Sequence, residues 1–157
     1  MTPQPARSSH TGMLIRCPRA EVFEAFVDPA ITARFWFTHS SGRLDAGKPV
    51  EWRWAMYDVS VTVTPRVVEP GRRIEIEWPG DPEPRTVEWT FESLGDDTTF
   101  VRIVEHGFTA IGADLVRQVA DSTGGFTLVL AGAKAWLERG MELNLVADRF
   151  PKGISEH

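Results

Sequence analysis

The stretch that decides the fold lies in the middle of the chain and reads Val50-Glu51-Trp52-Arg53-Trp54-Ala55-Met56. Apolar and polar residues alternate along it, which is typical of a β-strand with one face buried and the other in water. The same alternation returns in four later stretches, at residues 59–64, 73–78, 86–92 and 101–103. Turn-forming sequences such as Glu69-Pro70-Gly71 separate these stretches. The pattern predicts an antiparallel sheet with one apolar face.

The residues that precede these strands show mainly helical spacing. A short strand is expected at residues 13–17, and Pro18 ends it and starts a helix at 19–27. The apolar face of this helix is formed by Val22, Phe23, Phe26 and Val27. Asp28-Pro29 ends the helix, and we expect a second short helix at 30–35.

Helical spacing also follows the strands. Residues 111–120 fit one or two helical turns, and Gly124-Gly125 separates them from a longer helix at 126–141. This helix repeats apolar residues at intervals of three and four, namely Phe126, Val129, Leu130, Ala133, Trp136 and Leu137. It is the only long element expected to cover the sheet. The predicted fold class is α+β, with a curved antiparallel sheet of about six or seven strands wrapped around a long C-terminal helix, and two short helices after the first strand.

Length and composition fit a single domain. The chain has 157 residues and a net charge of −5, without the basic block that a nucleic acid requires or the apolar run that a membrane helix requires. We expect a flexible tail at residues 1–10, one domain at 11–145 and a C-terminal tail at 146–157. The chain start lacks a secretion signal, so a cytoplasmic location is expected, and the single Cys17 excludes an internal disulfide.

Several short motifs resemble those of a known superfamily. They are Val22-Phe23-Glu24-Ala25-Phe26 with Asp28-Pro29, Phe35-Trp36-Phe37, Val67-Val68-Glu69-Pro70-Gly71-Arg72-Arg73 leading to Glu77-Trp78, Val87-Glu88-Trp89, Glu105-His106-Gly107-Phe108 and Gly124-Gly125-Phe126. On these motifs the chain from Leu14 to Gly140 resembles the helix-grip superfamily of START, polyketide-cyclase and birch-pollen-allergen-like proteins, called SRPBCC. Within it, the chain resembles the stand-alone bacterial branch of the family named after the C-terminal domain of the heat-shock-protein-90 ATPase activator.

The resemblance implies a domain that is hollow between sheet and helix, and hence a protein that binds a small apolar or amphipathic molecule without a cofactor. Two alternatives stay open, because a fold does not fix a function. One is a cyclase- or aromatase-type enzyme in which Glu105, His106 or Asp58 moves a proton. The other is a chaperone-associated interaction module. The eukaryotic activator carries a separate N-terminal domain, whereas a short tail precedes Leu14 here, so we expect no stimulation of a chaperone ATPase.

The tryptophans are the main indication of a pocket. They are compatible with a solid core, but several of them on one face are also typical of an apolar cavity. The run Ala131-Gly132-Ala133 leaves the middle of the last helix short of bulk, which favours the cavity. The residues expected to contact a ligand are Trp36, Trp52, Trp54, Met56, Trp78, Trp89, Glu105, His106, Phe108, Phe126, Leu130 and Ala133.

The polar residues of the predicted site are Glu105 and His106, at the end of the last strand. The alternation with Val101 and Ile103 favours an inward Glu105, whereas a bulge at Gly107 would bring both side chains to solvent. An inward group would give a ligand hydroxyl or carbonyl a partner at the cavity mouth. The four histidines lack metal-ligand spacing, so no metal site is expected.

The basic residues favour self-association. Fourteen of the seventeen are arginine, whose planar donors suit protein interfaces, and the edges of an open sheet need cover. The expected partners are therefore a small hydrophobic molecule and a second copy of the chain.

Overall fold

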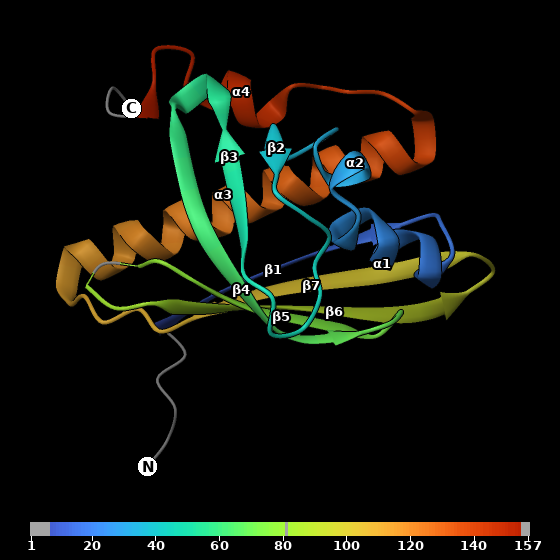
Figure 1. Cartoon of the computed structure of the whole chain (residues 1–157), viewed down its shortest axis with the longest axis horizontal. Coiled ribbons are helices and arrows are strands. Elements are labelled where there is room, and N and C mark those ends of the chain that lie inside the picture. The colour runs from blue at the N-terminus through green and yellow to red at the C-terminus, as the bar shows by residue number, and fades with distance from the viewer. Residues whose placement is uncertain (1–6, 81, 155–157) are drawn as a thin grey trace.

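The computed structural model describes residues 7–80 and 82–154, which form one curved sheet with helices on its concave side (Figure 1). In chain order the elements are β1 (Ser8–Ile15), α1 (Arg19–Val27), α2 (Pro29–Thr32), β2 (His39–Ser40), β3 (Val50–Trp54), a 3-10 turn η2 (Ala55–Tyr57), β4 (Val59–Glu69), β5 (Arg73–Trp78), β6 (Arg85–Gly95), β7 (Thr98–His106), α3 (Gly112–Arg139) and α4 (Leu145–Arg149).

The sheet has seven strands in the order β1-β7-β6-β5-β4-β3-β2, and all neighbours are antiparallel. The pairing of β4 with β5 shifts by one residue between Pro65 and Val67. Such bulges sharpen the bend of a strand, and beyond this point the sheet rises beside α3 (Figure 1). The predicted α+β class, the long C-terminal helix and the short helices after the first strand are confirmed.

The alternation read from the sequence sets which side chains face inward. Val50, Trp52 and Trp54 are buried along β3, and Val87, Trp89 and Phe91 are buried along β6. The pattern ends at Trp54 because Ala55–Tyr57 forms a turn, so Met56, expected to face inward, is 39% exposed.

The first strand begins earlier than expected. Residues 8–10 belong to β1, although the sequence placed them in a flexible tail and the strand at 13–17. Hydroxyl contacts explain this: Ser9 Oγ lies 2.6 Å from Ser122 Oγ, and Thr11 Oγ1 lies 2.7 Å from Thr127 Oγ1. This polar end of the strand is thereby fixed to α3 without an apolar pattern. The rest of the expected tail, residues 1–6, lies outside the described residues.

The last long helix is continuous. Gly124-Gly125, expected to separate two helices, lies inside α3, which runs from Gly112 to Arg139. Glycine costs a helix about 1 kcal/mol relative to alanine, which the packing of the whole helix outweighs. The hydroxyls of Thr123 and Thr127 donate to carbonyls four residues back, at 2.8 and 2.6 Å. Another helix, α4 (Leu145–Arg149), covers the first four residues of the expected C-terminal tail and starts one residue before that tail.

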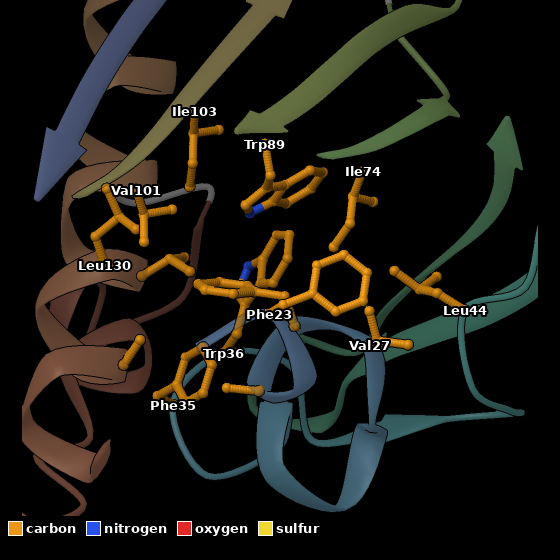
Figure 2. Close-up of a cluster of buried hydrophobic side chains, with 14 of the residues drawn as sticks. Phe23, Val27, Phe35, Trp36, Leu44, Ile74, Trp89, Val101, Ile103 and Leu130 are labelled. Carbon is orange, nitrogen blue, oxygen red and sulfur yellow. The ribbon is translucent and has the colours of Figure 1, made fainter. Parts of the chain in front are cut away.

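The core fills one end of the space under α3. Trp36 follows α2 and lies among side chains of the sheet and the helices, such as Trp89 and Leu130 (Figure 2). Its ring centroid is 4.9 Å from that of Trp52 and 6.0 Å from those of Trp54 and Trp89. These four tryptophans are called the aromatic core below. Cys17, just after β1, is buried, and burial raises the pKa of its thiol.

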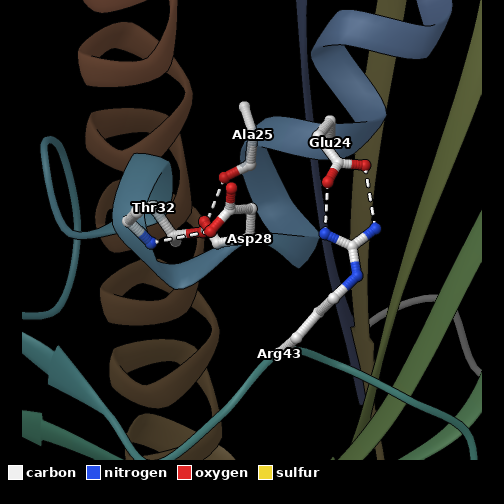
Figure 3. Close-up of polar contacts among 6 residues, drawn as sticks. Glu24, Ala25, Asp28, Thr32 and Arg43 are labelled. Atoms are coloured by element: carbon white, nitrogen blue, oxygen red, sulfur yellow. Dashed lines mark hydrogen bonds and ion pairs between the residues drawn. The ribbon is translucent and has the colours of Figure 1, made fainter.

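The turn between α1 and α2 holds Trp36 in place. The Asp28 side chain accepts a hydrogen bond from the Ala30 N–H at 3.0 Å and so caps α2. The hydroxyl of Thr32 shares its proton between the carbonyls of Ala25 and Asp28, at 2.6 and 3.0 Å (Figure 3). These bonds fix the angle between the two helices and hence the direction in which the chain enters the core.

Candidate functional site

The expected ligand floor is closed at its centre. Trp52, Trp54 and Trp89 pack against Trp36, and Leu130 and Ala133 of α3 are fully buried on them. The small residues of α3 do not leave space here, because a side chain on Gly132 would lie 3.0 Å from Phe35 Cβ. The open space lies further towards the start of α3.

That space is a pocket of about 220 Å³ between the sheet, α3 and α4, and we call it the Glu105 pocket. Its walls are mostly aromatic and aliphatic, with a few polar side chains. They comprise Trp36, Tyr57, Trp78, Glu105, Asp121, Ser122, Gly125, Phe126, Leu128, Val129, Val146, Arg149 and Phe150. Four of the expected ligand contacts lie here, namely Trp36, Trp78, Glu105 and Phe126.

The polar centre of the pocket is the carboxylate of Glu105, which is only 3% exposed. The Trp78 indole N–H donates to Oε2 at 2.7 Å, and the Ser122 hydroxyl donates to Oε1 at 2.7 Å. Since Ser122 has one hydroxyl proton and gives it to the carboxylate, Ser9 must be the donor in the Ser9–Ser122 bond. Trp78 of β5 and Ser122 of α3 therefore bind the carboxylate directly, and Ser9 of β1 is linked to it through Ser122.

The strand alternation continues to the end of β7, so Glu105 points inward, the direction favoured by its parity. Glu105 pairs with Val87 of β6 and with Ser9 of β1. His106 is exposed on the other face of the sheet. The bulge that would have brought both side chains to solvent is not present.

The helix α4 roofs the pocket. Val146 and Phe150 supply apolar walls. The Tyr57 hydroxyl donates to the carbonyl of Val146 and lies 3.2 Å from that of Ala147. The ring centroids of Tyr57 and Phe150 are 6.1 Å apart. Arg149 is exposed and stacks its guanidinium on Phe150, 4.9 Å from the ring centroid. One side chain of η2 therefore fastens the roof to the sheet.

Other expected site residues lie elsewhere. Phe108 is buried beyond the sheet end, with the Arg85 guanidinium 4.1 Å from its ring centroid. Asp58 is exposed and pairs with Arg53 at 3.0 Å. Of the acid–base candidates Glu105, His106 and Asp58, only Glu105 lines the pocket.

The sequence does not predict the residues that form the roof of the pocket or the polar residues that α3 contributes to its wall. These residues are Tyr57, Asp121, Ser122, Val146, Arg149 and Phe150. Val146, Arg149 and Phe150 lie in the segment expected as a C-terminal tail, and Asp121 and Ser122 lie between the two helices expected at 111–120 and 126–141. The available signal was Tyr57, the only tyrosine of the chain, immediately after the strand pattern ends.

A second hollow, the Arg43 groove, lies between α1, the loop before β3 and the turn after β4, with a volume of about 670 Å³. The Arg43 guanidinium binds both carboxylate oxygens of Glu24 across it, the longer contact being 2.9 Å (Figure 3). The hydrogen bond lowers the pKa of Glu24 and raises that of Arg43. The groove carries Asp45 and Lys48 as well, so its wall is more charged than that of the Glu105 pocket.

The described residues contain neither a cluster of metal ligands nor a membrane-spanning helix. No three His, Cys, Asp or Glu residues of 7–80 and 82–154 gather as metal ligands. No helix of these ranges has the length and apolar character to cross a bilayer.

Comparisons with known proteins place these features in context. A family model described as Activator of Hsp90 ATPase homolog 1-like protein matches residues 16–138. A solved structure of a protein from Staphylococcus saprophyticus is 29% identical, with a TM-score of 0.75, and the match covers 87% of this chain and 95% of that one. No curated protein sequence matches.

Two further solved structures share the fold at lower identity. DynU16, a protein of the dynemicin biosynthetic locus, is 21% identical with a TM-score of 0.72, over 88% of this chain and 49% of that one. The Aha1 dimer from Colwellia psychrerythraea is 16% identical with a TM-score of 0.72, over 85% of this chain and 97% of that one. At these identities the likeness shows the fold alone.

Proposed function

The chain belongs to the family of Activator of Hsp90 ATPase homolog 1-like proteins, and from this premise we propose that it binds a small apolar or amphipathic molecule in the Glu105 pocket. The observation that carries the proposal is an apolar pocket of about 220 Å³ with a buried carboxylate in its wall. Ligand sites are typically mostly apolar with a few convergent polar groups. The aromatic core beside it acts as a rigid wall.

The size of the pocket limits the ligand. An engineered apolar cavity of about 150 Å³ accepts benzene, so a volume of about 220 Å³ suits one ring or two fused rings with a short substituent. Long acyl chains and large polycyclic molecules would require α4 to leave the pocket.

Two neighbouring glycines of α3 provide a matched test. Gly125 lines the pocket and Gly124 does not, and a Cβ on either would meet nothing within 4 Å. Gly125→Leu is expected to fill the pocket and abolish binding of 2-naphthalenemethanol, measured by calorimetry on the full chain. Gly124→Leu makes the same change of helix propensity and should bind as the unmodified protein does. Equal binding by both variants would contradict the proposal.

A second candidate function is proton transfer on the bound molecule. It is favoured by Glu105, a carboxylate buried among neutral donors in the pocket wall. The carboxylate would take the α-proton of a bound ketone to give the enolate, and the enolate would take a deuteron from heavy water. NMR of a small aromatic ketone would report this exchange, which should disappear in Glu105→Gln. Exchange at the same rate in both proteins would reject it.

Self-association is also part of the proposal. The Colwellia psychrerythraea protein is a dimer, and this chain is rich in arginine on its exposed surface. Light scattering at high concentration should give twice the chain mass. A monomer mass at all concentrations would reject the dimer.

A further inference from the structure

The acceptor capacity of Glu105 is only partly used. A carboxylate has about four lone-pair sites on its two oxygens, and here each oxygen accepts one hydrogen bond, from Trp78 and from Ser122. Both donors are neutral. Within residues 7–80 and 82–154, no Lys, Arg or His forms an ion pair with Glu105.

A second carboxylate of the chain that is shielded from solvent has hydrogen-bond partners of a different kind. Glu138, near the other end of α3, receives the Lys134 ammonium at 2.7 Å and the Arg16 backbone N–H at 2.8 Å. Glu138 therefore has a cation of its own, whereas Glu105 has none. A buried charge without an opposite charge is costly, so a cation placed beside Glu105 would be bound favourably.

The remaining walls suit the aromatic body of such a cation. Trp78 and Phe126 form one wall with ring centroids 5.7 Å apart, and Tyr57 and Phe150 form the roof. Aromatic faces also attract cations. Asp121 adds a second carboxylate to the lining, and the one cationic lining residue, Arg149, is exposed and stacked on Phe150.

We infer that the Glu105 pocket takes small aromatic amines, with the protonated nitrogen donating to Glu105 and the ring against Trp78 and Phe126. This inference rests on the proposed binding function and names its ligand class. An aromatic alcohol also fits the pocket but donates a single neutral hydrogen bond. An aromatic carboxylate places a second negative charge against Glu105.

Three probes of the same shape separate these cases, namely 2-naphthylmethylamine, 2-naphthalenemethanol and 2-naphthoate. Their affinities for the unmodified full chain would be measured by calorimetry at neutral pH. The amine is expected to bind at least about tenfold more tightly than the alcohol, because its hydrogen bond is charge-assisted, and the carboxylate is expected to bind most weakly.

Glu105→Gln keeps the shape and removes the charge. It should bring the affinity of the amine to within about threefold of that of the alcohol, while the alcohol binds as before. Asp114→Asn is the matched control, since it removes one negative charge from an exposed position of α3 outside the pocket. The control should keep the full preference for the amine.

The outcomes distinguish the two proposals. If none of the probes binds, the pocket is not a ligand site and the proposed function fails. If all three bind equally, or if Glu105→Gln keeps the preference, the pocket stands and the amine inference is wrong. The ranking on the unmodified protein decides even where Glu105→Gln does not fold.

Discussion

The two ends of the space under α3 are built from the same sheet and the same helix, yet one is filled and the other is open. Around Gly132, the chain that follows α2 places Phe35 and Trp36 between sheet and helix, and Phe35 lies where a Gly132 side chain would be. Around Gly125, α4 and Tyr57 cover the space, and their side chains line it without filling it. The filling of each end therefore depends on the segment that reaches it.

The two ends also differ in whether their indole N–H groups have a hydrogen-bond partner. At the filled end, the indole N–H of Trp89 is buried and is the one buried side-chain N or O of the described residues without a hydrogen-bond partner. At the open end, the indole N–H of Trp78 donates to Glu105. The filled end therefore leaves one indole N–H without a hydrogen bond among packed rings, whereas the polar groups of the open end bind a carboxylate. The difference indicates that small residues on a helix do not by themselves predict a cavity.

The strongest test of the filled end is Trp36→Ala. Removing the ring at the centre of the aromatic core leaves a large void, and we expect a loss of about 3–5 kcal/mol in the free energy of unfolding. Urea denaturation measures it. Trp136→Ala is the control, because Trp136 is half-buried and stacks with Arg34 at 5.1 Å. Equal losses in both variants would mean that Trp36 does not fill the core.

Ala133→Leu tests whether the filled end has spare room. Ala133 is fully buried on the core and lines no part of the Glu105 pocket, so added methylene groups should overpack and cost about 1–3 kcal/mol. Thermal and urea melts would detect the change. Unchanged stability would point to hidden space beside Trp36, which is the cavity first expected from the sequence.

Glu138→Gln sharpens the contrast between the two carboxylates. Burial alone would raise the pKa of Glu138, but the hydrogen bonds from Lys134 and Arg16 lower it below its ordinary value. A lowered pKa stabilises the fold above the ordinary pKa of a glutamate, and this contribution is lost as the pH falls through the lowered pKa. The variant should therefore be about 1–3 kcal/mol less stable at pH 7, with the difference shrinking in acid. A difference independent of pH would contradict the charged pair.

The smallest expected effect comes from two alanine substitutions on α3. Gly125→Ala gains helix propensity and meets nothing, so it should raise the free energy of unfolding by about 0.5–1 kcal/mol. Gly132→Ala gains the same helix propensity, but its new Cβ would lie only 3.0 Å from Phe35 Cβ. Its free energy of unfolding should therefore be about 1 kcal/mol lower than that of Gly125→Ala. Chemical denaturation of the pair measures the difference. Equal stabilities would mean that the two ends pack alike.

Much of the fold could be predicted because its patterns are local. Strand alternation placed Trp52, Trp89 and Glu105 inward, and Pro18 with Asp28-Pro29 set both ends of α1. The strand β1 was placed too late because its first residues are held by hydroxyl contacts, which leave no apolar period. The division at Gly124-Gly125 was wrong because two glycines weaken a long packed helix without ending it.

The candidate site was harder to predict because it depends on contacts between distant segments. The composition of the last helix suggested space beside Ala133, but Phe35, about a hundred residues earlier in the chain, lies against the neighbouring Gly132. The pocket opens instead where Tyr57 fastens α4. Nothing in the local sequence of α4 indicates that it folds back.

The edge strand β1 has a consequence for synthesis of the chain. Its partner is β7, and even the partners closest in sequence, Ile15 and Thr99, are separated by most of the domain. The hydroxyl contacts of Ser9 and Thr11 form only after α3 has been synthesised, which is later still. At a translation rate of about 5–20 residues per second, β1 leaves the ribosome several seconds before its partners. During that interval the tryptophan-bearing strands are exposed without α3, and the nascent chain carries an unpaired edge that favours aggregation.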